Sequence, residues 1–472
     1  MIWPDLTLTA PIHPLARREA VKLLHSPAMS DTIFALASAP GKAGVAVIRV
    51  SGPGAADALR DLMGVLPEPR RATHRRLSDP RTGETLDDGI GLYFKAPASF
   101  TGEDVVELHL HGGRAVLSAV FAALGARPGF RIAEPGEFTR RAFLNGKFDL
   151  TTAEAVADLV AAETAAQRRQ ALRQLDGEFG RLCAAWRERL IRAQARLEAQ
   201  IDFPDEDLPP ALWSEVRDEV RILAEEIEGQ LTDGRRGERL RAGVSVAILG
   251  PPNAGKSSLM NALAQRDVAI TSHIAGTTRD VIEAELDLGG YPVILADTAG
   301  LRPAGDAVEE EGIRRARARA EAADLRLVVV DASKPEEWGP IRPYFDRDSI
   351  LVVNKIDLVE AEAGSVVLAP GGEPGLPVSV LTGRGMAELI QYLTEKVGKS
   401  LTGEHAPLVT RARHRQGLET CRDALRRFPA AILPELAAED LRTAATALGR
   451  INGQVDVEDM LDALFREFCI GK

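Results

Sequence analysis

The sequence predicts a multidomain protein in which an α+β domain comes first and an α/β domain is inserted between two parts of a discontinuous α-helical domain. Three observations predict this order. Short β-like runs such as VAVIRV and DVVELHLH alternate with glycine turns before residue 147. Alanine-rich helical sequence follows Thr151, and a strand-like run begins at Val244. Helical sequence returns after Gly398, so the second strand-rich segment interrupts the helical domain.

The helical domain is indicated by a start signal and by apolar spacing. Thr151 and Glu154 stand three residues apart, which is typical of a capping box at a helix start. After the breaker FPDEDLPP, apolar residues recur at spacings of three and four, which places them on one helix face. These residues are Leu212, Val216, Val220, Leu223, Ile227 and Leu231.

The inserted domain opens with a phosphate-binding pattern. Apolar Val244–Leu249 reads as a buried strand, and Gly250-x4-Gly255-Lys256-Ser257 follows it directly, before the helix-like run SSLMNALA. A strand, a glycine loop and a helix in this order direct backbone N–H groups and a helix N-terminus toward bound phosphates. We therefore expect Lys256 to contact the β and γ phosphates and Ser257 to bind Mg²⁺.

A second pattern predicts which base is bound. The apolar run SILVV ends in Asn354-Lys355-Ile356-Asp357, so this motif lies at the carboxyl end of another strand. The Asp357 carboxylate can accept hydrogen bonds from the N1–H and the exocyclic amine of guanine, which adenine does not offer. A site built on such pairs rejects the wrong base strongly, so the pattern favours GTP over ATP. We expect the backbone N–H of Val380, after Ser379, to bind the guanine oxygen.

Two stretches between these motifs have the character of nucleotide-sensing switches. Thr278 in GTTRD and Asp297 at the end of YPVILAD are the expected further Mg²⁺ ligands, and the Gly300 N–H is expected to contact the γ phosphate. Leu301 follows, and an apolar side chain cannot orient the attacking water. The acidic run that includes Glu309 either supplies the missing polar group or is a solvated helix start, which is the simpler interpretation.

The expected nucleotide-binding residues fall into four short stretches. They are Asn253, Ala254, Gly255, Lys256, Ser257 and Ser258, then Ser272, His273, Ile274, Ala275, Gly276, Thr277 and Thr278, then Asp297, Thr298, Ala299 and Gly300, and finally Asn354, Lys355, Asp357, Ser379 and Val380. Together they predict a Ras-like P-loop G domain.

The motifs GPPNAGKSS, IAGTTRD, DTAGLR and NKID together resemble the tRNA modification GTPases of the MnmE (TrmE) family. The resemblance extends upstream through SFTGEDVVELHLHGG, PGEFTRRAFLNGKFDL and IDFPDED, and downstream to the terminal FCIGK, so it covers about Ser30 to Lys472. It implies that Glu309 is the catalytic glutamate that orients water, with Lys256 and Gly300 at the phosphates. It also implies that Asn253, Ser272, Ile274 and Thr277 bind K⁺ when the G domains of a homodimer meet.

The resemblance further implies a tetrahydrofolate site in the first domain. Arg49, Glu107, Lys147 and the terminal Lys472 match the folate-contacting positions, where arginine and lysines suit a glutamate tail and a carboxylate suits a pterin. Glu107, His109 and His111 alternate along one expected strand face, and two histidines with a carboxylate are a possible metal set. Alternation alone would bring any three such residues together, so the sequence does not favour a metal.

By the same resemblance, the protein is expected to be a K⁺-stimulated GTPase that uses GTP, Mg²⁺, K⁺ and 5-formyl- or 5,10-methylene-tetrahydrofolate. With an FAD-containing partner of the GidA (MnmG) family, in a heterotetramer, it would install the aminomethyl or carboxymethylaminomethyl group on carbon 5 of the wobble uridine of certain tRNAs. The alternative is a ribosome-assembly GTPase that acts as a switch without any modification chemistry. The folate-like first domain and the FCIGK ending favour the first interpretation.

The composition limits which binding partners and which cellular compartment are expected. The chain has 472 residues, three cysteines far apart and a net charge of −11. The odd cysteine count argues for a reducing compartment, and the lack of a long apolar run predicts no membrane span, so we expect a cytoplasmic protein. An acidic chain must bind tRNA through a local basic patch. Residues 235–241 and 411–415 are candidates, although each also fits a solvated helix face.

The expected domain boundaries follow these changes of pattern. Residues 1–28 match nothing in the family and are expected to be a non-native or disordered extension. The folate-binding and dimerisation domain is expected over 29–147, the first helical part over 148–241, the G domain over 242–397 and the second helical part over 398–472.

Overall fold

The computed structural model describes most of the chain. The described residues are 31–202, 212–265, 283–297, 321–336, 338, 345–359, 367–368, 374–403, 405–431, 433–455, 461, 464–465, 468 and 471. The chain forms two compact units. One unit contains residues 1–157, 175–189 and 445–472, and the other contains residues 158–174 and 190–444. Within the described part of the chain, no helix is both long and apolar enough to cross a bilayer.

The first unit contains a six-stranded sheet with the strand order β3-β4-β5-β2-β1-β6. Its strands are β1 (Thr32–Leu36), β2 (Ala46–Ser51), β3 (Thr73–Ser78), β4 (Thr85–Phe94), β5 (Val105–Leu110) and β6 (Phe130–Ile132). All neighbours are antiparallel except β1 and β6. Buried side chains alternate along β2 and β5, because one face of the sheet is covered by the core.

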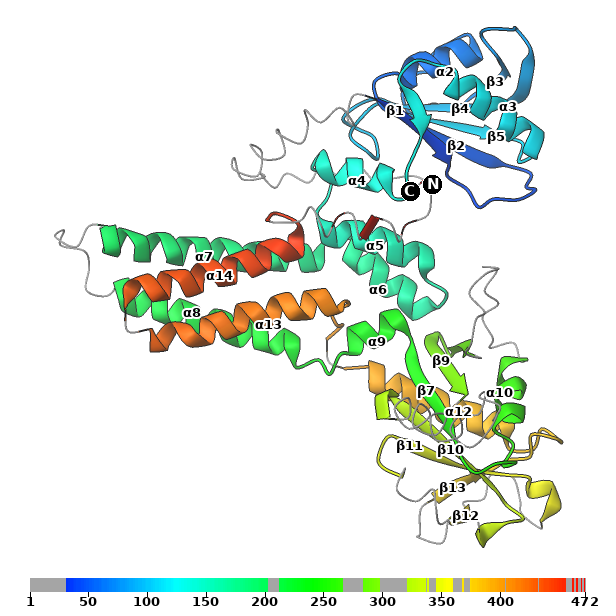
Figure 1. The fold of residues 1–472 in the computed structure, drawn as a ribbon, viewed down its shortest axis with the longest axis vertical. Coiled ribbons are helices and arrows are strands. Elements are labelled where there is room, and N and C mark those ends of the chain that lie inside the picture. Colours follow the sequence, from blue (N-terminus) through cyan, green and yellow to red (C-terminus); the bar gives the residue numbers. More distant parts are fainter. Residues whose placement is uncertain are drawn as a thin grey trace, which may run out of the picture. The chain divides into compact units, whose positions relative to one another are not determined.

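Helices cover both faces of this sheet unequally. On one face, α2 (Ala55–Met63) and α3 (Arg114–Gly125) pack against β2 and β5 in the main core of the domain (Figure 1). On the other face, Ile33 and Ala35 of β1 contact Phe138 of α4 (Glu137–Leu144), and Ser51 and Val105 at the ends of β2 and β5 are also buried. The face that carries Arg49 and Glu107 is therefore only partly covered.

The two sequence segments that were predicted to be helical form helices. They are α5 (Leu150–Ala161), α6 (Ala165–Leu175), α7 (Glu178–Asp202), α8 (Leu212–Leu231), α13 (Ala412–Arg427) and α14 (Pro434–Asn452). The apolar stripe predicted for α8 is confirmed at every residue whose side chain is described, from Val216 to Leu231. The predicted cap of α5 is wrong, because Asp149 rather than Thr151 accepts the Thr152 N–H at 2.8 Å and the helix begins at Leu150.

The second unit contains a seven-stranded sheet with the order β12-β13-β11-β10-β7-β9-β8. Its strands are β7 (Val244–Leu249), β8 (Glu283–Leu288), β9 (Tyr291–Asp297), β10 (Leu325–Asp331), β11 (Ser349–Asn354), β12 (Val367–Leu368) and β13 (Pro374–Pro377). The five central strands are parallel, and β8 and β12 are antiparallel edge strands. The helices α9 (Arg236–Ala242), α10 (Lys256–Ala264) and α12 (Met386–Leu401) accompany them.

Helices α10 and α12 bury their apolar residues against β7, β9 and β10 in one core (Figure 1). Because β7, β10 and β11 are parallel, their carboxyl ends lie at the same end of the sheet. Ligands bind at this end in folds of this kind. The short 3₁₀ turn η3 (Ile356–Leu358) follows β11 at that end.

Candidate functional site

The phosphate-binding loop lies where the sequence predicts it, between β7 and α10. Gly250 has a φ of 144°, and a Cβ at this position would overlap with the carbonyl oxygen of Val329. The Lys256 ammonium lies over the loop and donates to the carbonyl oxygens of Gly250 (2.9 Å) and Pro251 (2.8 Å). The loop therefore curls around the ammonium group that is expected to contact phosphates.

Asn354 joins the base-recognition segment to the phosphate loop. Its side chain is buried, and its Nδ2 donates to the carbonyl oxygen of Ala254 at 2.9 Å. Gly255, at φ 97°, leaves the room for this contact, because a Cβ there would overlap with the Asn354 amide. The last residue of β11 is thus bound directly to the loop that follows β7. This contact fixes the relative position of the two halves of the expected nucleotide site.

Asp357 and Ser379 form the second half of the base site. The Ser379 hydroxyl donates to Asp357 Oδ1 at 2.5 Å and accepts the Thr382 N–H at 3.2 Å. This pair orients the carboxylate that is expected to read guanine. The Val380 N–H, expected to bind the guanine oxygen, donates to Asn354 Oδ1 at 3.2 Å, so Asn354 and Val380 are partners in this structure.

Asp331, which was not expected from the sequence, supports the same segment through Lys355. Asp331 ends β10 and is almost fully buried, and its Oδ2 accepts the Lys355 ammonium at 2.7 Å. Burial raises the pKa of Asp331, but Lys355 and the Ser333 donors outweigh burial and keep the pKa below its usual value. An acidic residue at the end of the apolar run LRLVVV, one strand before the base motif, was the available signal.

Several expected site residues lie outside the described residues. They are Ser272, His273, Ile274, Ala275, Gly276, Thr277, Thr278, Thr298, Ala299, Gly300 and Glu309 in this unit, and Lys472 in the other. Asp297 is described only through its backbone, which ends β9 opposite Ile248 of β7. Its register therefore places it at the same edge as the phosphate loop, as predicted.

A second polar site lies on the partly covered face of the N-terminal sheet. Arg49 and Glu107 are direct cross-strand partners on β2 and β5, and the Arg49 guanidinium donates to Glu107 Oε1 from Nε (3.1 Å) and Nη2 (2.9 Å). Phe100 and Phe138 lie 5.2 and 5.7 Å from the guanidinium carbon, measured to the ring centroids. The side chains of Arg49 and Glu107 therefore lie together, but they form an ion pair with each other.

The charge state of Glu107 reflects its neighbours. Burial raises the pKa of this carboxyl, while His109 and Arg49 lower it, and the net result is a pKa below the usual value. His109 Nε2 lies 3.6 Å from Glu107 Oε2, too far for a hydrogen bond, so we attribute its effect to charge. Lys147 donates to the carbonyl oxygen of Pro97, in the loop after β4, at 2.9 Å.

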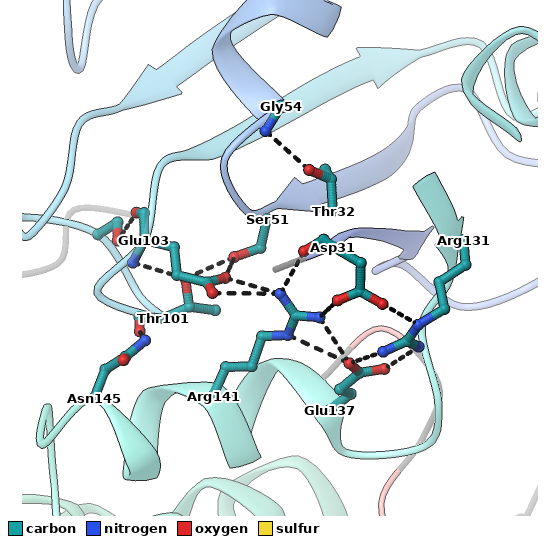
Figure 2. A network of polar contacts seen from close by, with 11 residues as sticks. Asp31, Thr32, Ser51, Gly54, Thr101, Glu103, Arg131, Glu137, Arg141 and Asn145 are labelled. Carbon is teal, nitrogen blue, oxygen red and sulfur yellow. Dashed lines mark hydrogen bonds and ion pairs between the residues drawn. The ribbon is translucent and has the colours of Figure 1, made fainter. Parts of the chain in front are cut away.

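A buried charge network fixes α4 beside this face (Figure 2). Arg141 of α4 is 2% exposed and forms ion pairs with Asp31, Glu103 and Glu137. Glu103 also accepts the Ser51 hydroxyl at 2.7 Å. Because Phe138 lies on the same helix, this network sets the position of one of the two rings that contact Arg49.

The metal interpretation of the alternating face receives no support. His111 binds Asp87 at 2.8 Å rather than turning toward Glu107 and His109. Among the residues that the structure describes, no cluster of three or more potential ligands could hold a metal ion.

Both basic segments proposed as nucleic-acid patches are largely engaged inside the second unit. Arg415 is 7% exposed and pairs with Glu238 (2.6 Å) and Asp233 (2.7 Å). Arg241 and Arg411 share the Asp158 carboxylate at 2.8 and 2.7 Å. The patch interpretation and the solvated-face interpretation are therefore both wrong for Arg411 and Arg415, whose side chains are largely buried in ion pairs, whereas Arg241 is paired but remains partly exposed.

The fold and the first site define a class of protein. A mainly parallel sheet with a phosphate loop after one strand and an Asn-Lys-x-Asp segment after another, tied together through Asn354, is the architecture of a P-loop GTPase domain.

Comparison with known proteins narrows this class to one family. A family profile described as "MnmE helical domain" matches residues 150–469, and one described as "GTP-binding protein TrmE N-terminus" matches residues 32–147. A "tRNA modification GTPase MnmE" of Parvibaculum lavamentivorans is 56% identical over 450 residues, with 94% of this chain and 100% of that protein covered. The chain belongs to the MnmE family of tRNA modification GTPases.

Two further relatives show the breadth of the family. An MnmE of Rhodospirillum rubrum is 56% identical over 457 residues, covering 94% of this chain and 99% of its own. The human "5-taurinomethyluridine-[tRNA] synthase subunit GTPB3, mitochondrial" is 48% identical over 471 residues, covering 95% and 94%.

Proposed function

We propose that this protein hydrolyses GTP in support of a modification on carbon 5 of the wobble uridine of certain tRNAs. The observation that carries the proposal is the contact between Asn354 and the Ala254 carbonyl, which fixes the base motif and the phosphate loop as one site. Family membership supports the tRNA substrate, because the bacterial relatives are named as tRNA modification GTPases.

Guanine is the base that this site suits. Asp357, held by Ser379, presents a carboxylate to two donors on one edge of the base, and only guanine has both. Adenine would leave the half-buried Asp357 carboxylate without these two donors, and such a mismatch gives strong discrimination against the wrong base.

The cations fit the described part of the loop. Ser257 opens α10 beside Lys256, where a hydroxyl can bind Mg²⁺, together with Thr278 and Asp297 from the switch segments. Asn253 is exposed, with a φ of 61°, so its side chain can reach a K⁺ ion from the outer surface of the loop. We propose that Ser272, Ile274 and Thr277 complete the K⁺ site, that Glu309 orients the water, and that hydrolysis requires two G domains of a homodimer.

The N-terminal face is proposed to bind a tetrahydrofolate. Its described residues fit such a group in part: Arg49 can attract the glutamate tail and Glu107 can accept from the pterin, but each must exchange its present partner to do so. A folate would supply the one-carbon unit. We propose that Lys147 and Lys472 add positive charge, and that an FAD-containing protein of the GidA (MnmG) family acts as the partner in a heterotetramer.

The proposal is tested by nucleoside analysis of tRNA from a strain that lacks the gene, complemented with wild type or with Asp357→Asn. We expect the modified wobble uridine to disappear in the deletion strain and to return only with the wild type. Unchanged wobble uridines in the deletion strain would instead favour a GTPase switch without modification chemistry.

A further inference from the structure

Helix α6 has two polar faces of different kinds. It begins with a capping box in which the Thr164 hydroxyl accepts the Gln167 N–H (3.4 Å) and Gln167 Oε1 accepts the Thr164 N–H (3.0 Å). The helix AAQRRQALRQL contains three arginines and no acidic residue. Three glutamines occur at spacings of three and four, so they share one face, and the arginines lie away from it.

The glutamine face binds the segments that lead into and out of the G domain. Gln167 donates to the carbonyl oxygen of Arg241 (3.0 Å) and Gln170 donates to that of Gly237 (3.2 Å), both in α9 just before β7. Gln174 donates to the carbonyl oxygen of Leu408 (2.6 Å), in the segment after α12. Gln170 and Gln174 are each only 4% exposed.

The start of α6 is also attached to the G domain itself. The Ala166 N–H donates to the carbonyl oxygen of Gly290 at 3.0 Å, in the turn between β8 and β9. The Ala166 side chain is buried in the same core as β7, β9 and α12. Although the sequence places α6 in the helical domain, its packing makes it part of the G-domain unit.

The opposite face of α6 carries Arg168, Arg169 and Arg173. Arg168 and Arg169 are exposed and Arg173 is half-buried, with the exposed Leu172 between them. None of the three guanidinium groups forms a hydrogen bond or ion pair with any residue that the structure describes. We call this set the α6 ridge.

We propose that the α6 ridge is a contact site for the phosphate backbone of tRNA. Three guanidinium groups that have no acidic partner among the described residues and that share one helix suit a polyanion, because guanidinium and phosphate form charge-assisted, often bidentate hydrogen bonds. The chain as a whole is acidic, with a net charge of −11, so such a contact has to be local. This inference rests on the proposed tRNA function and gives it a place on the molecule.

The ridge is the better candidate among the basic surfaces described. Arg241, Arg411 and Arg415 form ion pairs with acidic residues of the same unit. Arg75 and Arg76 on β3 are also exposed, but β3 is an edge strand, where charge serves to prevent pairing with another strand. These two arginines provide a matched control.

Together, the two faces of α6 would link RNA binding to nucleotide binding. RNA bound on the ridge would contact a helix whose other face holds both connections of the G domain. RNA binding and nucleotide binding would then be energetically coupled, and the coupling must act equally in both directions.

The test uses the full chain with Arg168, Arg169 and Arg173 all changed to Gln, which keeps good helix propensity. Binding of a labelled tRNA transcript is measured by fluorescence anisotropy at a series of KCl concentrations. We expect the affinity to fall at least about tenfold, and the slope of log K against log salt to decrease by about one for each lost phosphate contact. An unchanged circular dichroism spectrum and melting temperature would establish that the variant is folded.

R75Q/R76Q is expected to keep the wild-type affinity and salt slope. Wild-type binding by the α6 variant, or lost binding by the β3 variant alone, would overturn the proposal. Lost binding of the flavoprotein partner with tRNA affinity intact would show that the ridge contacts a protein, which also overturns it.

Complementation separates this inference from the proposed function. If the wild-type gene restores the modified uridine and the α6 variant restores it equally with wild-type tRNA affinity, only the ridge proposal fails. If loss of the gene leaves the wobble uridine unchanged, the proposed function itself fails.

Discussion

The two polar sites of this protein are built in opposite ways. In the G domain, Ser379 orients the Asp357 carboxylate, and Asn354 binds the Ala254 carbonyl of the phosphate loop and the Val380 N–H. On the N-terminal sheet, Arg49 and Glu107 neutralise each other across two neighbouring strands. The Asp357 carboxylate of the first site is already oriented by Ser379, whereas a ligand at the second site must separate an ion pair.

This difference has an energetic meaning. A preorganised site spends little of its binding free energy on rearrangement, so single changes within it should affect affinity strongly. An ion pair that is present before the ligand binds contributes to the folding stability of its own domain. Changes in the G domain should thus appear in nucleotide affinity, and changes at the N-terminal face should appear in folding stability.

The largest expected effect comes from Asp357→Asn. Asparagine offers an amide N–H where guanine presents its amine, so GTP affinity should fall by about 10⁴-fold. Xanthosine triphosphate carries a carbonyl oxygen at that position and should bind the variant better than GTP. Competition against a fluorescent guanine nucleotide measures both affinities, and a variant that still prefers GTP would contradict the role given to Asp357.

The next effect compares two glycines with positive φ. Gly255→Ala places a Cβ against the Asn354 amide, so GTP affinity should fall at least about tenfold, or about 1.4 kcal/mol. Gly64, at φ 72°, ends α2 with open space around it. Gly64→Ala should cost about 1 kcal/mol of stability through backbone strain and leave GTP affinity unchanged. Equal nucleotide affinity in both variants would refute the preorganisation of the phosphate loop.

A smaller effect is expected at the N-terminal face. Arg49→Met leaves the Glu107 carboxylate without its main partner and should lower the free energy of unfolding by about 2 kcal/mol at neutral pH. The folded pKa of Glu107 lies below its ordinary value of 4.5, so its stabilising contribution is present above that pH and is lost as the pH falls through the folded pKa.

The difference between wild type and Arg49→Met should accordingly shrink under acidic conditions. Denaturant unfolding at several pH values measures it, and Arg60→Met, which breaks an exposed pair with Asp57, serves as the control with little expected change. A difference that grows as the pH falls would contradict this assignment.

The smallest effect concerns a group that belongs to neither site. Burial raises the pKa of the Cys421 thiol to about 12, so almost no thiolate is present near neutral pH. Ellman's reagent should react with Cys421 only after denaturation. Rapid reaction at Cys421 in the folded protein, distinguished from Cys183 and Cys469 by mass spectrometry of the labelled peptides, would show that α13 opens.

The sequence predicted what depends on local patterns. The strand before the phosphate loop, the position of Asp357 after β11 and the apolar stripe of α8 are all confirmed, because each is encoded within a few neighbouring residues. It could not predict what depends on distant contacts. The pairing of Arg415 with Asp233 joins residues 182 positions apart, and a local basic run does not reveal such a partner.

The packing of α6 illustrates the same limit. Its helical pattern was recognisable, but its attachment to the G domain rests on Gln170 and Gln174, whose partners lie 67 and 234 residues away. The domain boundary expected near residue 241 follows sequence pattern alone and stays a prediction. The residues expected to bind K⁺ likewise stay a prediction, to be tested by comparing GTP turnover in K⁺ and Na⁺.

The central claim is that a triphosphate held at Lys256 is identified as guanosine by Asp357. Competition of GTP, ITP and ATP against a fluorescent guanine nucleotide on the purified wild-type chain tests it most directly. ITP keeps the N1–H but lacks the exocyclic amine, so the expected order of affinity is GTP, then ITP, then ATP. Equal affinity for GTP and ATP would contradict the account.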